Sequence, residues 1–114
     1  MSFNEAINYS DDKMHLNNLL KQAEHTSDDE YRIIYLKLHP ELDSRVRSAI
    51  ENQEFYTGMK KEDTRASWGH PHTINRSVGQ YGIHEQWVYC KYGDCISGAT
   101  YVYFDDGILT SWQD

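Results

Sequence analysis

The sequence predicts an α+β domain in which N-terminal helices are followed by a four-stranded antiparallel β-meander, with the helices packed on one face of the sheet. Three observations support this fold class. Apolar residues recur at helical spacing in the first part of the chain, and from His72 onward the spacing changes to two. Between the last two alternating runs stands Asp106-Gly107, a pair typical of a type I′ hairpin turn. With 114 residues and 39% hydrophobic content, the chain has the size and composition of one folded unit.

The first two predicted helices form an N-terminal extension over residues 1–39. The first helix starts after residues 10–12, where a serine cap is followed by two aspartates. Ser27 and Glu30 have the spacing of a capping box and open the second helix. That helix should end at His39-Pro40, because the residue before a proline avoids the helical conformation. Residues 40–114 then make up the main α+β domain, and we expect the two parts to form one compact unit.

Two further helices precede the sheet. One covers about residues 41–52, where apolar residues are spaced for a single buried stripe. The other covers residues 60–68 and follows Gly58, which permits a turn in the backbone. Gly69 and Pro71 come after this helix, and that order is a common way for a helix to stop.

The second half of the chain contains four candidate strands with period-two alternation. They cover residues 73–78, 84–91, 100–104 and 108–112. In the second strand, Trp87 and Tyr89 alternate with Val88 and Cys90, so the two pairs face opposite sides of the sheet.

Large aromatic residues are expected to anchor the core between helices and sheet. Trp68, Trp87 and Phe104 have the size for this role. Gly107 completes the last hairpin turn. These are packing and turn roles, and none of them is catalytic chemistry.

The chain is acidic, with a formal net charge of −7. Residues 1–40 carry seven acids and four bases, and residues 41–114 carry eleven and seven, so the excess is spread along the chain. A negative field repels phosphate, which argues against direct binding of nucleic acid. It favours a basic protein partner, and it also serves to keep a small domain soluble. The basic clusters are expected to be solvated helix faces paired with nearby acids: Lys60-Lys61 with Arg65, and Arg45 with Arg47.

Features that would direct the chain to a membrane are missing from the sequence as given. The first residues have neither the basic nor the apolar segment of an export signal, and no apolar run approaches the ~20 residues needed to span a bilayer. We therefore expect a cytoplasmic protein without membrane contact. Cys90 and Cys95 are too few for a disulfide scaffold, and free thiols are expected in a reducing compartment. A bond between them would indicate an oxidising compartment or purification in air.

No residue pattern matches a known catalytic or metal-binding motif. His70 and His72 lie one residue apart and His84 begins a strand, but the spacing places no third ligand, so no metal or other cofactor is expected. The spacing of Cys90 and Cys95 is neither that of a redox motif nor that of a zinc knuckle. The sequence also lacks a Gly-x-Ser-x-Gly nucleophile elbow and a Gly-rich phosphate loop. These observations predict that the protein is not an enzyme.

Four segments between residues 50 and 113 follow an order found in a known family. They are YTGMKKED at 56–63, SWGHP at 67–71, EQWVY at 85–89 and YVYFDDGILTS at 101–111. In this order the chain resembles the SmpA/OmlA (BamE-like) small-lipoprotein family, and its architecture is similar to that of the β-lactamase inhibitor proteins. The resemblance implies a scaffold or binding domain without catalytic activity. The chain departs from the family in lacking an export signal and a lipidated cysteine, in its N-terminal extension, and in a Cys-x-x-x-x-Cys insertion.

Together these observations predict a non-enzymatic protein-binding domain. We expect an inhibitor or immunity-type protein that neutralises a basic enzyme or toxin, because an acidic inhibitor can occupy the place of nucleic-acid phosphate. The alternatives are a structural scaffold module related to outer-membrane assembly lipoproteins, and an enzyme with an unrecognised site. Nine tyrosines suit both sheet packing and a binding face, and alternation leaves open which face is exposed. The residues expected to touch the partner are Tyr81, Tyr92, Tyr101, Tyr103, Trp112 and Asp94.

Overall fold

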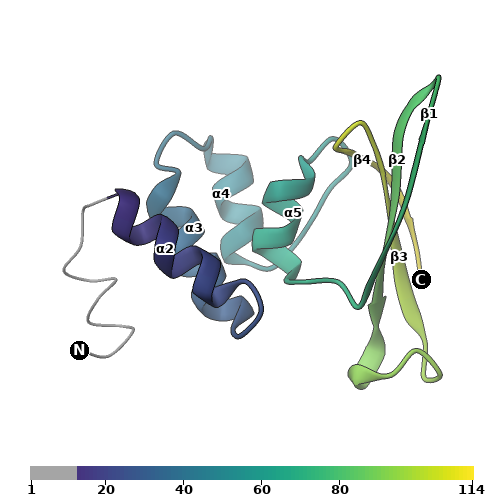
Figure 1. Ribbon diagram of the computed structural model, residues 1–114, viewed down its shortest axis with the longest axis horizontal. Helices are drawn as coiled ribbons and strands as arrows, with labels where there is room; N and C mark the ends of the chain where they lie inside the picture. The colour runs from purple at the N-terminus through teal and green to yellow at the C-terminus, as the bar shows by residue number, and fades with distance from the viewer. Residues whose placement is uncertain (1–12) are drawn as a thin grey trace.

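A computed structural model describes residues 13–114 as a set of helices followed by a sheet (Figure 1), which confirms the predicted α+β class. The helices are α2 (Lys13–Ala23), α3 (Asp28–Leu38), α4 (Ser44–Glu51) and α5 (Lys61–Trp68). The strands are β1 (Thr73–Gly79), β2 (Gly82–Cys90), β3 (Ala99–Asp105) and β4 (Ile108–Gln113), with a 3₁₀ turn η1 (Lys91–Gly93) between β2 and β3. The cap predicted at residues 10–12 lies outside the described residues.

The helix starts follow the predicted capping chemistry with one shift. Ser27 Oγ accepts a hydrogen bond from Glu30 N at 3.2 Å, which confirms the cap of α3. The helix predicted to begin near residue 41 begins instead at Ser44. The reason is that Asp43 is the capping residue, and its Oδ1 accepts from Val46 N at 2.9 Å.

The four strands form one antiparallel meander in the order β1-β2-β3-β4. The turn between β3 and β4 has positive φ at both Asp106 (49°) and Gly107 (82°), as a type I′ turn requires, so this prediction is confirmed. A β-bulge lies between Tyr103 and Phe104. Figure 1 shows the helices gathered on one side of the sheet. We call the helix-covered side the inner face and the other side the outer face.

The core lies between the inner face and the helices. Trp87 and Phe104 are buried, with ring centroids 4.5 Å apart, which confirms two of the three predicted anchors. Trp68 is only half-buried and packs edge-on against Phe55 and Tyr89. A second group of buried residues joins α2 to α3, and Leu20 and Tyr31 pack against both groups. The buried members of this second group are Leu16, Leu19, Ala23 and Ile34.

Helix α5 occupies the middle of the structure and buries polar side chains with their partners. Tyr35 Oη donates to Asp63 Oδ1 at 2.6 Å, and Ser67 Oγ donates to the carbonyls of Ala49 and Glu54. Polar groups removed from water cost free energy unless they find such partners. These bonds therefore fix the position of α5 between the other helices and the sheet.

Arg65 was expected on a solvated helix face, and that prediction is wrong. The side chain is 9% exposed, because it reaches from α5 into the junction between α2 and α3. Its guanidinium donates to Asp28 Oδ1 (3.1 Å) and Glu24 O (2.8 Å) and lies 4.0 Å from the centre of the Tyr31 ring. The predicted pairing with an acid is present, but the acid is Asp28, which lies thirty-seven residues earlier in the chain. Spacing along the sequence could not identify a partner so distant.

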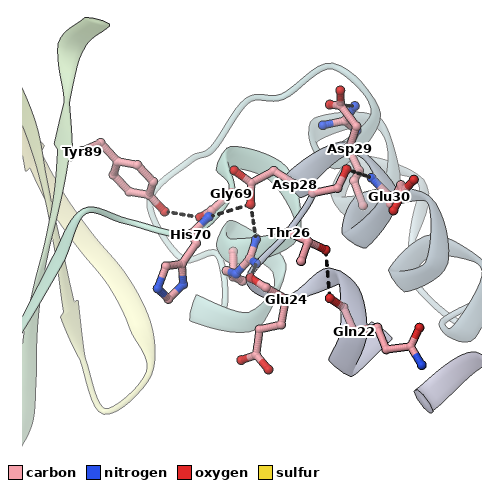
Figure 2. A network of polar contacts seen from close by, with 12 residues as sticks. Gln22, Glu24, Thr26, Asp28, Asp29, Glu30, Gly69, His70 and Tyr89 are labelled. Carbon is pink, nitrogen blue, oxygen red and sulfur yellow. Dashed lines mark hydrogen bonds and ion pairs between the residues drawn. The ribbon is translucent and has the colours of Figure 1, made fainter. Parts of the chain in front are cut away.

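The junction continues from the helices to the sheet (Figure 2). Asp28 Oδ1 also accepts from His70 N at 3.1 Å, and Gly69 O accepts from Tyr89 Oη at 2.9 Å. Gly69 ends α5 as predicted, with φ of 90°. A β-carbon there would collide with the Asp28 carboxylate, so this position requires glycine for space as well as for conformation.

Truncating the core aromatics should destabilise the fold. Trp87→Ala and Phe104→Ala each remove a buried ring and should lower the free energy of unfolding by ~3–5 kcal/mol in urea denaturation. Trp112→Ala is the matched control, because Trp112 is 47% exposed and should cost clearly less. Unfolding midpoints like that of the wild type in the two core variants would contradict the described packing.

The Tyr35–Asp63 bond should make stability sensitive to alkaline pH. Burial, and then the hydrogen bond to Asp63, raise the pKa of Tyr35 far above its ordinary value of about 10. The unfolded chain therefore loses this proton first, so the free energy of unfolding should fall as pH rises above ~10. Tyr35→Phe should cost ~1–3 kcal/mol at neutral pH, since Asp63 loses its donor. The variant should also show a shallower alkaline decline, and an unchanged decline would contradict this assignment.

Candidate binding surface

No helix covers the outer face of the sheet (Figure 1). Residues paired directly across antiparallel strands share a face, so the register defines its members. They are Thr73, Asn75 and Ser77 from β1; His84, Gln86 and Val88 from β2; Tyr101, Tyr103 and Asp105 from β3; and Ile108, Ser111 and Gln113 from β4. Amide, hydroxyl and phenol groups dominate this set, and its only carboxylate is Asp105.

A row of side-chain hydrogen bonds crosses the outer face through all four strands. Asn75 Nδ2 donates to Gln86 Oε1 at 3.0 Å, and Gln86 Nε2 donates to Tyr103 Oη at 3.3 Å. Tyr103 Oη in turn donates to Gln113 Oε1 at 3.3 Å. Each member restrains its neighbour, so these polar groups are held in place before any partner arrives.

A second row on the same face contains Ser77, His84 and Asp105, which lie opposite one another in the register. His84 Nδ1 lies 2.6 Å from Asp105 Oδ1, which matches the base and orienting acid of a serine nucleophile triad. However, within residues 13–114 no hydrogen bond joins Ser77 to His84, and all three side chains are exposed. This row is therefore a His–Asp pair next to a serine, without the activated nucleophile of a hydrolase.

Beyond one end of β2 the chain forms a loop closed by a bond between Cys90 and Cys95. The expectation of free thiols is therefore wrong for this structure. The backbone turns back sharply through positive φ at Tyr92 (54°) and Gly93 (79°), which brings the two α-carbons to 4.5 Å, within the range of a disulfide. We call residues 90–98 the disulfide loop.

The disulfide loop displays two large apolar side chains to solvent. Tyr92 is 93% exposed and Ile96 is 99% exposed. Asp94 accepts from Ser97 N at 2.7 Å and from Ser97 Oγ at 3.2 Å, and these bonds hold the pKa of Asp94 below its ordinary value. The loop is thus restrained by a covalent bond and by an acid-centred turn, while its apolar side chains remain uncovered.

The predicted partner-binding residues do not form one patch. Tyr101 and Tyr103 lie on the outer face, and Tyr92 and Asp94 lie on the disulfide loop near one end of it. Tyr81 is 83% exposed in the turn between β1 and β2, at the opposite end of the sheet. Trp112 pairs with Val102 on the inner face, where its ring packs edge-on against Phe55 at 5.2 Å.

Sequence reasoning missed the polar row and the exposed tip of the loop. Alternation along β2 and β3 already places Gln86 and Tyr103 away from the core, so the row was within reach once the hairpin register was known. Ile96 carries no such signal, because it lies in the loop between the strands, where no alternation indicates which side chains are exposed.

Charged groups are placed at the two ends of the outer face and not at its centre. Asp94 lies in the disulfide loop at one end, whereas Asp114 accepts from Thr100 Oγ at 2.7 Å, and Thr100 pairs with Tyr89 on the inner face. Asp105 and Asp106 lie at the end with the β3–β4 turn. Between residues 71 and 114 the bases are Arg76 and Lys91, and Arg76 interacts with Glu85 at 3.6 Å. Lys60 and Lys61 also adjoin the β3–β4 turn, since Lys60 pairs with Ile108 and Lys61 N donates to Gly107 O, so charges of both signs flank this end of the face.

A group of potential metal ligands lies beside the disulfide loop. One ligand atom each of His72, Cys90 and Cys95 falls within 4.8 Å of the others. His70 is not part of this group, since its ring faces that of His25, with centroids 5.6 Å apart. The two histidines, which are one residue apart in the sequence, thus lie in two different places, and the potential ligand atoms near His72 are the two cysteine sulfurs.

Searches of known proteins add no relative: no family model, no curated protein and no solved structure matches this chain. The resemblance to small lipoproteins remains a hypothesis based on the four sequence segments. Among the helices of residues 13–114, none has the length and apolar character to cross a membrane.

The covalent closure of the loop should contribute to stability. Closing a loop of this length is worth ~2 kcal/mol in the chain-entropy account of disulfides. Cys95→Ser should therefore unfold at lower urea concentration than the oxidised wild type, and at about the same concentration as the reduced wild type. Equal midpoints for the oxidised wild type, the reduced wild type and the variant would contradict a stabilising bond.

Proposed function

We propose that this chain is a non-enzymatic protein-binding domain that neutralises a basic enzyme or toxin, as an inhibitor or immunity-type protein does. One observation carries the proposal. An uncovered sheet face with an uncharged, hydrogen-bonded centre adjoins a disulfide-closed loop that exposes Tyr92 and Ile96. Contiguous exposed surface marks interaction sites, whereas single exposed apolar residues do not, so we treat Tyr92, Ile96 and the adjoining sheet face as one surface.

The chemistry of the outer face suits protein recognition. Centres of protein interfaces are depleted in charge and enriched in tyrosine, and binding loops of antibodies use tyrosine, serine and asparagine in the same way. Asn75, Gln86 and Tyr103 supply donors and acceptors that are already oriented by their mutual bonds. Such preorganisation lowers the entropy cost of binding.

The charge distribution supports a basic partner. The excess of acids over bases, a formal net charge of −7, attracts a positive surface over a distance and repels nucleic-acid phosphate. A partner that normally holds phosphate would present the complementary charge, which is why we favour a nuclease-like enzyme or toxin. A cytoplasmic location remains a prediction, and the disulfide is more typical of oxidising compartments.

A scaffold role is the second candidate, and the order of the four family-like segments favours it. In that case the same surface would hold a component of an envelope assembly, and the partner need not be basic. The identity and charge of the captured partner separate the two functions. An enzymatic role has less support, since the Ser77–His84–Asp105 row lacks the bond that would activate the serine.

Affinity capture with matched variants tests the proposal. The tagged chain is incubated with lysate of the organism that encodes it, at low and at high salt, beside the double variant Tyr92→Ala/Ile96→Ala. We expect one stoichiometric, basic partner that is released at high salt. The double variant should lose about tenfold or more in affinity, because exposed aromatic and apolar anchors carry much of the binding energy at interfaces.

The control is Ile33→Ala, which removes an exposed isoleucine from the helical side of the molecule and should leave capture unchanged. Equal loss in the control and the double variant would contradict a surface centred on the loop. An acidic partner, or one held equally at both salt concentrations, would reject the inhibitor function and favour the scaffold.

A further inference from the structure

The end of the sheet beside the disulfide loop brings together one imidazole and two sulfurs from separate segments. His72 directly precedes β1, Cys90 ends β2, and Cys95 belongs to the loop, and their ligand atoms lie within 4.8 Å of one another. His72 is held by the sheet, since its N–H donates to Val88 O at 2.8 Å. Lys91 N donates to Gly98 O at 2.9 Å and holds the base of the loop. The convergence therefore follows from backbone bonds on both sides of the group.

Two thiolates and an imidazole are a preferred donor set for zinc. With Zn–S near 2.3 Å and Zn–N near 2.0–2.1 Å, tetrahedral coordination places ligand atoms about 3.5–3.8 Å apart. That separation lies within the span of the group. Three protein ligands leave the fourth position to water. Asp94 is already engaged by Ser97 N and Oγ, so it is not counted as a ligand.

We propose that Cys90, Cys95 and His72 form a zinc site that is available only when the disulfide is reduced. A dithiol reductant delivers two electrons and two protons to the S–S bond, which gives two thiols, and the reductant itself becomes a disulfide. Zn²⁺ then replaces both thiol protons and takes a lone pair from neutral His72. In the oxidised form both sulfurs are used in the covalent bond, so the site cannot hold the ion.

The covalent bond and the metal ion each keep the two ends of the disulfide loop together. The S–S bond does so in the oxidised form, and the ion does so in the reduced form. Gly93 and Gly98 both lie in the loop, and Tyr92, Asp94 and Ile96 around them are exposed, so the sulfurs can separate to the metal-bound distance without disturbing the core. The inference does not depend on the proposed binding function.

Metal titration of the full chain tests the site, with Co²⁺ as the spectroscopic probe. Anaerobically reduced wild type should bind one equivalent and develop the thiolate-to-cobalt charge-transfer band and the strong visible bands of four-coordinate cobalt. Added Zn²⁺ should abolish these bands. The oxidised chain should show none of them. His72→Ala should weaken Co²⁺ binding about tenfold or more, and the neighbouring His70→Ala should leave it unchanged.

Any of three results would overturn the proposal. One is that reduced wild type with a native circular dichroism spectrum takes up no stoichiometric cobalt. Another is that His72→Ala and His70→Ala bind cobalt equally, which would mean that the cysteines act without His72. The third is that Cys95→Ser keeps the full charge-transfer intensity, which would mean that the sulfur ligands are misassigned.

Discussion

The arrangement of helices on the sheet depends on the contacts of one side chain, Arg65. It emerges from the central helix and binds the carboxylate of Asp28 and the carbonyl of Glu24, while its guanidinium covers the ring of Tyr31. Asp28 then bonds the backbone that leads into the sheet, and Tyr89 of the sheet bonds the same segment from the other side. The planar guanidinium of arginine has several fixed donors, so it can bond the carboxylate and the carbonyl while it stacks on the tyrosine ring. The single ammonium group of lysine could not make all three contacts. Because the helices are held against the inner face in this way, the outer face remains uncovered.

The fold was largely predictable from local patterns, and the exceptions have definite causes. The size of the Trp87 ring indicated its place in the core, and the Asp-Gly pair located the last turn. Trp112 was misplaced because strict alternation puts it on the side opposite Leu109. The bulge opposite Tyr103 and Phe104 leaves Thr110 of the same strand unpaired and so brings Leu109 and Trp112 onto the inner face. Arg65 shows another cause, since a cationic residue on a helix reads as exposed unless its distant partner is known.

The candidate site was less predictable, because its parts meet only through strand register. His72 reaches the cysteines because the β1–β2 hairpin turns through two residues, Gln80 and Tyr81, which pairs Thr73 with Val88. The same register decides that His70 lies apart, with its ring against His25. Cysteine spacing alone pointed to no known motif, and spacing within one segment cannot reveal a ligand supplied by another strand. Sites of this kind become visible from sequence only when the pairing of the hairpin is worked out in full.

On the outer face, the charged groups lie at the ends and the uncharged polar groups lie at the centre. These two sets of groups have different physical roles in binding. Carboxylates at the ends act through a field that extends over about a Debye length, near 8 Å at physiological salt, so they mainly influence how fast a partner arrives. The amides and phenols at the centre, together with Tyr92 and Ile96, act only on contact, so they mainly influence how long a partner stays. Closure of the loop restrains these contact groups in advance. Breaking or replacing the bond between Cys90 and Cys95 would therefore change the dissociation rate of a partner. It would not change the surface charge that influences the association rate.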